Sequence, residues 1–257
     1  MTPTTTPSTE STPVALISGA NRGIGFQVAK DLAANGFIVL VGSRDLDNGT
    51  EAAAEIDASA QAIGLDVADA TSVAAAAERI RRDFGRLDLL VNNAGVSFIG
   101  SPDTPLRERA ESGLFTNVSL ETMRRIYEIN VFGVVALTQA LLPLLRATEG
   151  SRIVNVGSGG GSLSANSDPD NPHRRMFGVY PASKAALHAV SLGFATALEE
   201  EGIPVNTVDP GLTSTGLNGF QSVRTVEEGA ARIVEVALQG RSGPTGTFTS
   251  DEGTVPW

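Results

Sequence analysis

The sequence of 257 residues contains no cysteine, which excludes disulfide bonds, thiolate nucleophiles and cysteine-ligated zinc or iron–sulfur centres. Imidazole is scarce as well, because His173 and His188 are the only two histidines. Basic side chains are outnumbered, with 19 Lys and Arg against 29 Asp and Glu and a net charge of −10. An acidic surface repels the phosphates of nucleic acids and anionic lipids. We therefore expect no nucleic acid and no membrane among the partners.

The chain also lacks a long hydrophobic run. Its longest apolar stretch, residues 131–145, is interrupted by polar residues and Pro143 and falls short of the roughly 18 to 20 residues that span a bilayer. Residues 1–13 are rich in Thr, Ser and Pro and are predicted to form a disordered tail. The tail has no secretory signal pattern, so we expect a cytoplasmic protein. Hydrophobic residues make up 41% of the chain, and residues 14–257 are predicted to form a single domain.

Short β-branched runs alternate with longer helix-like segments from Val14 onward. Ser119 and Thr225 are predicted helix N-caps, the latter in a capping box with Glu228. Continuous apolar strands separated by helices are typical of a parallel sheet that is covered on both faces. We therefore predict an α/β fold of the Rossmann type, a doubly wound and mostly parallel sheet with its ligand crevice at the carboxyl ends of the strands. The predicted strands are residues 14–18, 37–41, 61–65, 87–91, 152–156 and 203–208.

A glycine-rich turn, GANRGIG, follows the first predicted strand and opens a helix. Gly19, Gly23 and Gly25 let the backbone turn tightly and approach a pyrophosphate, and the helix N-terminus offers free N–H groups. Glycine triplets also occur in ordinary turns. The position on the first strand-to-helix turn favours a dinucleotide site.

The chain resembles the short-chain dehydrogenase/reductase family, and specifically its carbonyl-reductase-like branch. The matching motifs cover nearly everything after the tail and occur in the family's order. They are SGANRGIG at 18–25, NNAG at 92–95, Asn130, Ser158, YPASK at 180–184 and PG at 210–211. Ser18 stands where the family usually has Thr, and the hydroxyl is kept. The branch is suggested by the elongated segment between Ser158 and Tyr180.

Tyr180 and Lys184 form an i, i+4 pair, which lies on one face of a helix. A nearby ammonium lowers the pKa of a phenol, which then exchanges protons with an alcohol or a carbonyl more readily. An isolated pair of this kind is more often a surface tyrosine beside a solvated lysine. The family resemblance implies that Tyr180 is the catalytic acid/base and that Lys184 also holds the nicotinamide ribose. His188, further along this helix, is expected to pack or to face solvent.

Ser158 and Asn130 complete the predicted catalytic set. Ser158 follows the fifth strand, where a hydroxyl can donate to the substrate oxygen, although Ser162 and Ser164 compete for that role. Asn130 lies in a long helix where asparagine has poor propensity. The resemblance implies that it bends the helix and anchors a water that passes protons to Lys184. A satisfied buried asparagine is the alternative.

The resemblance also implies a set of cofactor-binding residues along the crevice. No metal site is expected, because Asp168, Asp170 and His173 lie in a segment typical of turns. The predicted cofactor-binding residues are Gly19, Asn21, Arg22, Gly23, Ile24 and Gly25 at the phosphates, Ser43, Arg44, Asp66, Val67, Asn93, Ala94 and Gly95 on the adenosine side, and Tyr180, Lys184, Pro210, Gly211 and Thr213 at the nicotinamide.

The choice of cofactor depends on the end of the second predicted strand. Ser43 stands where the family's NAD users tend to have Asp, and Arg44 follows it. With Arg22, this arginine offers charge-assisted contacts to the 2′-phosphate of NADP. Asp45 is the opposing feature, because its carboxylate suits the ribose of NAD. We expect NADP(H) to be preferred over NAD(H).

The sequence predicts a nicotinamide-dependent oxidoreductase that interconverts a ketone or aldehyde and an alcohol. A 3-oxoacyl thioester is the rival substrate, and a non-catalytic nucleotide sensor and a Rossmann-like methyltransferase are the alternatives from other classes. The resemblance implies a homodimer or homotetramer, which the long segment before Tyr180 would hinder. Apolar residues expected around the carbonyl are Phe98, Met176, Phe177, Leu212, Leu217 and Phe220.

Overall fold

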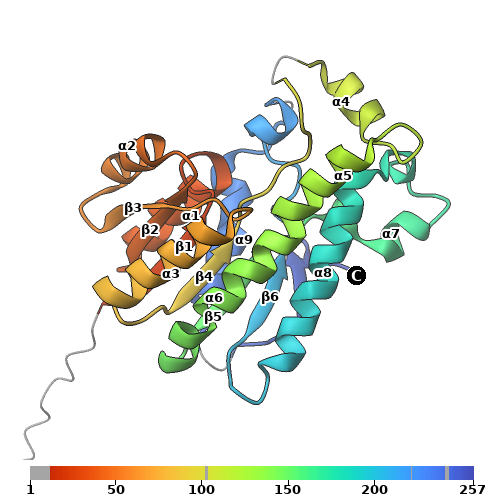
Figure 1. Ribbon diagram of the computed structural model, residues 1–257. Coiled ribbons are helices and arrows are strands. Elements are labelled where there is room, and N and C mark those ends of the chain that lie inside the picture. Colours follow the sequence, from red (N-terminus) through yellow and green to blue (C-terminus); the bar gives the residue numbers. More distant parts are fainter. Residues whose placement is uncertain (1–11, 102–103, 221, 241–242) are drawn as a thin grey trace, which may run out of the picture.

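The computed structural model describes residues 12–101, 104–220, 222–240 and 243–257 (Figure 1). The predicted tail therefore lies outside the described residues, except for positions 12 and 13. The Pro13 carbonyl accepts a hydrogen bond from the Ile38 amide at 2.8 Å. The strands are β1 (Val14–Ser18), β2 (Ile38–Ser43), β3 (Ala60–Gly64), β4 (Leu89–Asn92), β5 (Arg152–Val156), β6 (Val205–Val208), β7 (Phe248–Ser250) and β8 (Gly253–Thr254).

The eight strands form one sheet in the order β3-β2-β1-β4-β5-β6-β7-β8. All pairs are parallel except β7 with β8. The strand order reverses between β1 and β4, so the loops after these two strands diverge and leave a crevice at their carboxyl ends. The helices are α1 (Gly23–Ala34), α2 (Leu46–Ile56), α3 (Ala70–Asp83), α4 (Leu106–Ser112), α5 (Leu120–Tyr127), α6 (Gly133–Ala147), α7 (Leu163–Ser167), α8 (Val179–Ala197) and α9 (Val226–Leu238).

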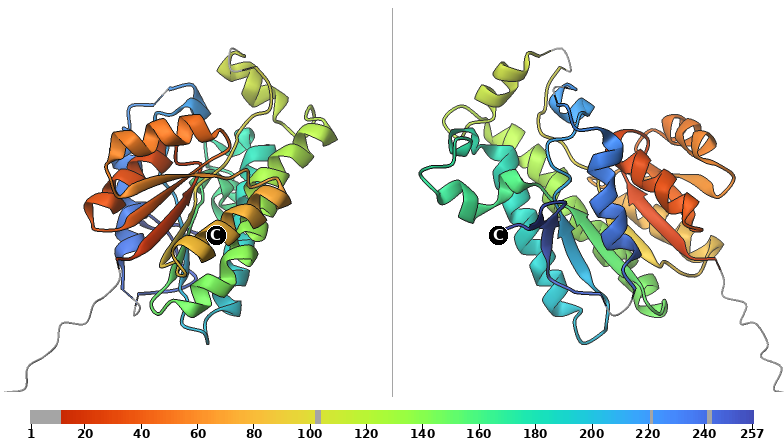
Figure 2. Two further views of the ribbon diagram at one scale, coloured as in Figure 1. Left: turned by 60° about the vertical axis from the view of Figure 1, so that its left-hand side comes forward. Right: turned by 180° about the vertical axis from the view of Figure 1, so that it is seen from behind.

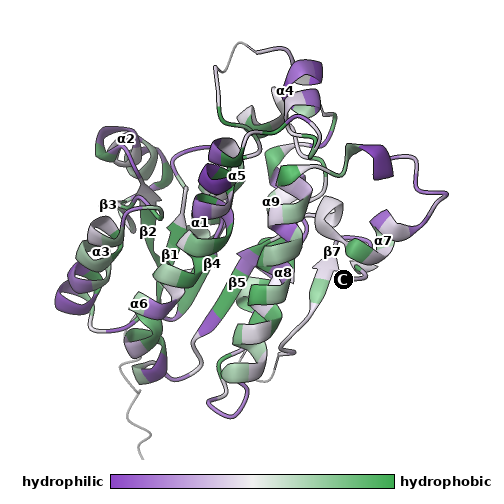
Figure 3. Cartoon of the chain, turned by 45° about the vertical axis from the view of Figure 1, so that its right-hand side comes forward, coloured by the Kyte–Doolittle hydropathy of each residue, from purple (hydrophilic) through white to green (hydrophobic). Residues whose placement is uncertain are grey.

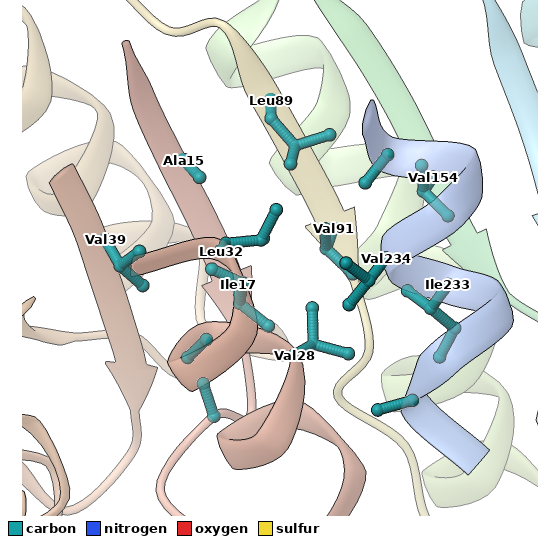
Figure 4. Close-up of a cluster of buried hydrophobic side chains, with 14 of the residues drawn as sticks. Ala15, Ile17, Val28, Leu32, Val39, Leu89, Val91, Val154, Ile233 and Val234 are labelled. Atoms are coloured by element: carbon teal, nitrogen blue, oxygen red, sulfur yellow. The ribbon is translucent and has the colours of Figure 1, made fainter. Parts of the chain in front are cut away.

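Helices cover both faces of the sheet, and each face has its own hydrophobic core (Figure 2). On one face, Val28 and Leu32 of α1 and Ile233 of α9 pack on the strands (Figure 4). On the other face, α3, α6 and α8 supply side chains such as Ile80 and Leu141. Hydrophobic residues concentrate on the strands and on the inner faces of the helices (Figure 3). The predicted doubly wound α/β fold is confirmed.

Several local predictions hold at the level of individual residues. The Ser119 side chain caps α5, and Thr225 and Glu228 form the capping box of α9. The short elements α4, α7, β7 and β8 were not predicted. All four span seven residues or fewer, and the pairing of β7 with β6 joins segments about 40 residues apart, which no local pattern shows.

The helix from Leu120 to Ala147 is continuous, because a π-helical turn, Glu128–Phe132, joins α5 to α6. By length and composition this helix could cross a membrane. However, 56% of its most apolar window is buried inside the protein, as in the core helix of a globular domain. Its apolar character is therefore explained by packing on the sheet.

Candidate active site

The loops after β1 and β4 are tied together at the point where the strand order reverses. The Ser18 hydroxyl accepts hydrogen bonds from the amides of Asn93 and Ala94, each at 3.0 Å. The Asn93 side-chain amide donates in return to the carbonyls of Ser18 and Gly19 at 2.9 and 3.0 Å. These contacts fix the mouth of the crevice and explain why a hydroxyl is needed at position 18.

A cavity of about 240 Å³ lies along this mouth and reaches from the end of β2 to the start of α8. Most of the predicted cofactor-binding residues line it, together with Tyr180 and Lys184. Leu217, which was expected beside the carbonyl, lines it as well, and six lining residues were not predicted: Leu65, Val96, Ile129, Val156, Gly157 and Thr215. The predicted residues that line it are Gly19, Asn21, Arg22, Gly23, Ile24, Gly25, Arg44, Asp66, Val67, Asn93, Ala94, Gly95 and Pro210.

The glycine turn and the first turn of α1 fit a pyrophosphate. Arg22, the N-cap of α1, makes no side-chain capping bond, so the first amides of the helix keep their hydrogen-bonding capacity. Gly23 has a φ of +60°, which favours glycine. A Cβ on Gly25 would lie 2.3 Å from Asn93 Nδ2 and 2.6 Å from the Gly19 carbonyl oxygen. No side chain fits there, and the backbone is free to approach a bound phosphate.

Three predicted cofactor-binding residues, Ser43, Gly211 and Thr213, do not line the cavity. Ser43 is 2% exposed and packs against Gly49 of α2. The Thr213 hydroxyl donates to the Pro210 carbonyl at 3.0 Å and is buried under α9. Successive side chains of a strand point to opposite faces of the sheet, and Ser43, the last residue of β2, falls on the core side. Thr215 and Leu217, slightly further along the same loop, reach the cavity instead.

Two exposed arginines, Arg22 and Arg44, line the cavity near the ends of β1 and β2. Asp45, the residue that would favour NAD, is the N-cap of α2. Its Oδ1 accepts hydrogen bonds from the amides of Asp47 and Asn48 at 3.0 and 3.2 Å. The Asp45 side chain is thus engaged away from the cavity lining, whereas Arg44 belongs to that lining.

Tyr180, Lys184 and Ser158 come together at the other end of the cavity. Lys184 Nζ lies 5.9 Å from the centroid of the Tyr180 ring and donates to the Val156 carbonyl at 2.8 Å. The Ser158 side chain hydrogen-bonds to the Tyr180 phenol. Ser158 Oγ also accepts from the Gly160 amide at 3.2 Å, which fixes the serine at the start of its turn. Ser162 instead caps α7, so it does not compete for the site.

The ionisation of this group differs from the sequence expectation. Burial of the phenol raises the pKa of Tyr180 to about 12, and the Ser158 hydrogen bond lowers it only in part. Burial lowers the pKa of Lys184 to about 8. The pKa of Tyr180 is therefore shifted upward, opposite to the lowering that the Lys184 ammonium was predicted to cause.

Asp209 is a charged neighbour of this site that sequence reasoning missed. Its carboxylate raises the pKa of both Tyr180 and Lys184. Its Oδ1 accepts from the Gly211 amide at 3.0 Å, and a Cβ on Gly159 would lie 2.6 Å from its Oδ2. Its place in the sequence, directly before Pro210 and Gly211 at the end of β6, could have indicated a residue near the crevice.

Asn130 lies in the π-helical turn and is 1% exposed. Its side chain donates to the Val96 carbonyl at 2.8 Å and to Ser183 Oγ at 3.0 Å, and it accepts from the Val96 amide at 2.8 Å. The local distortion of the helix matches the expected bend. Asn130 is thus a satisfied buried asparagine, which was the alternative, and its expected role in passing protons to Lys184 stays a prediction.

Three of the apolar residues that were expected around the carbonyl are strongly exposed. Leu212, Phe220 and Met176 are 71%, 72% and 61% exposed, and they come from the segments after β6 and before α8. The Ser97 hydroxyl donates to the Leu217 carbonyl at 2.9 Å and so joins the loop after β4 to the loop after β6. In Figure 1 this last loop, in blue, lies at the same end of the molecule as α4.

The acidic segment before α8 forms turns. Asp168 Oδ1 accepts from the Asp170 amide at 2.9 Å, and Asn171 Oδ1 accepts from the His173 amide at the same distance. Within the ranges that the structure describes, no three His, Asp or Glu residues are grouped as metal ligands.

The family model of short chain dehydrogenases matches residues 13–224. The chain belongs to this family. It is 33% identical over 289 aligned residues to (+)-neomenthol dehydrogenase of Arabidopsis thaliana, with 94% of this chain and 97% of that relative covered. The short-chain dehydrogenase is thus an oxidoreductase of a family that acts on alcohol and carbonyl groups and uses nicotinamide cofactors.

Two solved structures are similar to this short-chain dehydrogenase. Salutaridine reductase from Papaver somniferum has a TM-score of 0.77 and 29% identity, with 93% of this chain and 99% of that chain covered. A 3-ketoacyl-(acyl-carrier-protein) reductase from Brucella melitensis, solved in complex with NADH, has the same TM-score and 26% identity, with 93% and 96% covered.

Proposed function

We propose that this short-chain dehydrogenase is an NADP(H)-dependent reductase of ketones or aldehydes, with Tyr180 as the acid/base. One observation carries the proposal: a single cavity is lined by Arg22 and Arg44 at one end and by Tyr180 and Lys184 at the other. A nicotinamide dinucleotide has the matching distribution of groups, with a phosphorylated ribose at one end and the reactive ring at the other.

The two arginines support NADP(H) rather than NAD(H). A guanidinium that contacts a phosphate forms a charge-assisted hydrogen bond, worth on the order of 1.5 to 3 kcal/mol. One such contact to the 2′-phosphate favours NADPH by roughly tenfold or more. The carboxylate that would favour NAD belongs to Asp45, which caps α2. The similar reductase from Brucella melitensis was solved with NADH, so the choice is specific to the residues of this chain.

The catalytic group handles the proton of the reaction. When bound, the reduced nicotinamide supplies a hydride to the carbonyl carbon. Tyr180 donates its phenolic proton to the carbonyl oxygen, and a phenol with a pKa raised to about 12 is fully protonated before this step. The Ser158 hydroxyl orients the same oxygen and stabilises the charge that develops on it. Lys184, beside Asn130, returns a proton towards the tyrosine.

The substrate end favours a bulky apolar ketone or aldehyde. Leu217 lines the cavity, and Leu212 and Phe220 lie exposed on the same loop. Apolar side chains of this kind bind apolar substrate surface by removing it from water. The names of the relatives point in the same direction, since one acts on an alcohol, neomenthol. We extend this chemistry to the present chain as a cyclic ketone or its alcohol.

Steady-state kinetics with NADPH and NADH against a panel of cyclic ketones, aldehydes and a 3-oxoacyl thioester tests the proposal. We expect clear turnover of an apolar ketone with NADPH and a lower kcat/KM with NADH. The Arg44→Ala variant should lose most of the preference for NADPH, chiefly through KM. Asp47→Ala, a charge change nearby outside the cavity lining, is the control and should keep it.

The same panel separates the alternatives. A preference for the 3-oxoacyl thioester would move the substrate class towards that of the bacterial neighbour. Tight binding of NADPH without turnover of any substrate would indicate a nucleotide sensor. A preference for NADH would contradict the role of Arg44. The assembly as a homodimer or homotetramer stays a prediction.

A further inference from the structure

The turn that carries Ser158 packs closely against the imidazole of His188. His188 lies in α8, one helical turn beyond Lys184, and is 3% exposed. Its Nε2 accepts a hydrogen bond from the Ser158 backbone amide at 3.4 Å. A Cβ on Gly157 would lie 2.8 Å from Nε2, and one on Gly161 would lie 2.9 Å from Cε1. The backbone therefore wraps closely around the ring on both sides of the serine.

The opposite side of the imidazole is held by the C-terminal part of the chain. The His188 ring lies 4.3 Å from the Phe248 ring and 6.0 Å from the Trp257 ring, centroid to centroid. The Trp257 carbonyl accepts hydrogen bonds from the Ser164 amide at 2.9 Å and the Ser162 hydroxyl at 3.4 Å. The imidazole is thus clamped between the serine turn and β7, and its orientation is fixed.

The buried imidazole of His188 has one ring nitrogen without a hydrogen bond to any described residue. Nδ1 is buried and has no hydrogen-bond partner among the residues that the structure describes. A buried polar atom without a partner destabilises a fold by about 1 to 3 kcal/mol. A leucine or methionine would pack here without that cost. The acceptor at Nε2 is the one feature of His188 that such an apolar side chain cannot supply.

The ring is neutral over the ordinary pH range. Burial and the charge of Lys184 lower the pKa of His188 to about 4. A neutral imidazole that accepts at Nε2 carries its proton on Nδ1. The acceptor is therefore available at any pH well above 4.

We propose that His188 is a positioning residue for Ser158: its Nε2 holds the serine backbone so that the hydroxyl faces the Tyr180 phenol and the substrate oxygen. The inference rests on the proposed role of Ser158 in the reaction. It extends that role to a residue that touches neither substrate nor cofactor. The hydrogen bond from the Gly160 amide to Ser158 Oγ shows how the backbone of the turn sets the hydroxyl.

The test is a double-mutant cycle between position 188 and Ser158, followed by kcat and by the KM for NADPH. His188→Leu removes the acceptor, and His188→Gln restores an acceptor at the end of a flexible side chain. We expect His188→Leu to lower kcat about tenfold with an unchanged KM for NADPH, and His188→Gln to recover most of the loss. Ser158→Ala should lower kcat by about 10² to 10³.

The decisive comparison is the double variant. A residue that acts only through the serine hydroxyl has nothing left to position, so Ser158→Ala with His188→Leu should match Ser158→Ala within about twofold. Multiplied losses in the double variant, or a wild-type kcat for His188→Leu, would overturn the inference. A wild-type kcat for Ser158→Ala would instead overturn the proposed function of the serine, which keeps the two failures distinct.

Two further variants separate positioning from stability. Ser191→Ala removes another buried hydrogen bond on α8, to Asn155, with no contact to the serine turn. This control should lower the thermal midpoint and leave kcat unchanged. If His188→Leu folds poorly, His188→Met fills the same space without a strong acceptor, and it enters the same cycle with the same expected outcomes.

Discussion

The two ends of the crevice are built in different ways. At the nucleotide end, short turns are locked by backbone contacts, such as the Ser18 hydroxyl that binds two amides of the β4 loop. At the substrate end, Leu212 and Phe220 stand more than 70% exposed on a long loop. One end is held by hydrogen bonds between its two loops, and the other presents exposed apolar surface. The difference indicates that separate residues position the cofactor and select the substrate in this chain.

The relatives are named for different substrates. Proteins named for neomenthol, salutaridine and a 3-ketoacyl group share this fold at 26–33% identity. A rigid nucleotide end can serve all of these chemistries while the exposed loops vary. Substitutions at the two ends should therefore affect different kinetic parameters.

The largest effect is expected at the junction of the two ends. Tyr180→Phe removes the proton donor and keeps the ring, so turnover should fall by about 10² to 10⁴ while NADPH still binds. Turnover and the Kd for NADPH, from the quenching of Trp257 fluorescence or from calorimetry, provide the measurement. A variant with near-normal turnover would exclude Tyr180 as the acid.

A substitution of Lys184 should raise the stability of the protein while it lowers the activity. The pKa of Lys184 is lowered to about 8 in the folded chain from 10.5, so the unfolded chain binds more protons between these values, and the wild type gains stability as pH rises through that window. Lys184→Met removes the buried charge. At pH 7 this variant should be more stable by about 1 to 3 kcal/mol, with turnover lost and NADPH bound more weakly.

The stability advantage of Lys184→Met should shrink between pH 8 and 10.5, which denaturant unfolding at several pH values measures. The loss of the hydrogen bond from Lys184 to the Val156 carbonyl reduces the advantage, and the pH trend is the robust part. A difference between the two proteins that does not change with pH would contradict the assigned ionisation.

The rigid nucleotide end should not accept even a methyl group. Gly25→Ala forces a Cβ to within 2.6 Å of the Gly19 carbonyl, so the free energy of unfolding should fall by about 1 to 3 kcal/mol and NADPH binding should weaken. Gly193→Ala in α8 is the matched control, since nothing lies within 4 Å of its Cβ position. That variant should gain about 0.5 to 1 kcal/mol. Equal thermal midpoints for Gly25→Ala and Gly193→Ala would show that the turn at Gly25 tolerates a methyl group, against this prediction.

The smallest effect is expected at the substrate end. Leu217→Ala removes apolar surface from the cavity wall but leaves the Leu217 carbonyl that binds Ser97. The KM for an apolar ketone should rise several-fold, because the side chain is 40% exposed and contributes only part of the roughly 1.5 to 3 kcal/mol of a buried leucine. The KM for NADPH should stay constant. A change in the KM for NADPH alone would contradict the assignment of Leu217 to the substrate end of the cavity.

The sequence predicted what depends on local pattern. Strands β1 and β5 have their predicted bounds, and the glycine turn lies where expected, because apolar runs and turn residues act over a few positions. Sequence patterns did not predict which side chains at the ends of strands point into the crevice and which point into the core. Ser43 and Thr213 turn inward, and the pKa of Tyr180 moves upward through burial that no motif reports.

The role of the C-terminal segment was also beyond sequence reasoning. His188 was expected to pack or to face solvent, and it does pack. Its ring contacts the Ser158 amide on one side and lies against Phe248 of β7 and Trp257, which are far from it in the chain. Contacts between positions so far apart in the chain leave no periodic signal.

The central claim is that hydride moves directly from NADPH to a carbonyl carbon at the Tyr180 end of the cavity. Reduction of an accepted ketone with NADPH that carries deuterium on one face of the nicotinamide C4 tests it, with the alcohol analysed by mass spectrometry and NMR. We predict one deuterium at the carbinol carbon of each product molecule from one of the two labelled cofactors and none from the other. Deuterium that stays on the nicotinamide with both, or enters the product from both alike, would contradict the account.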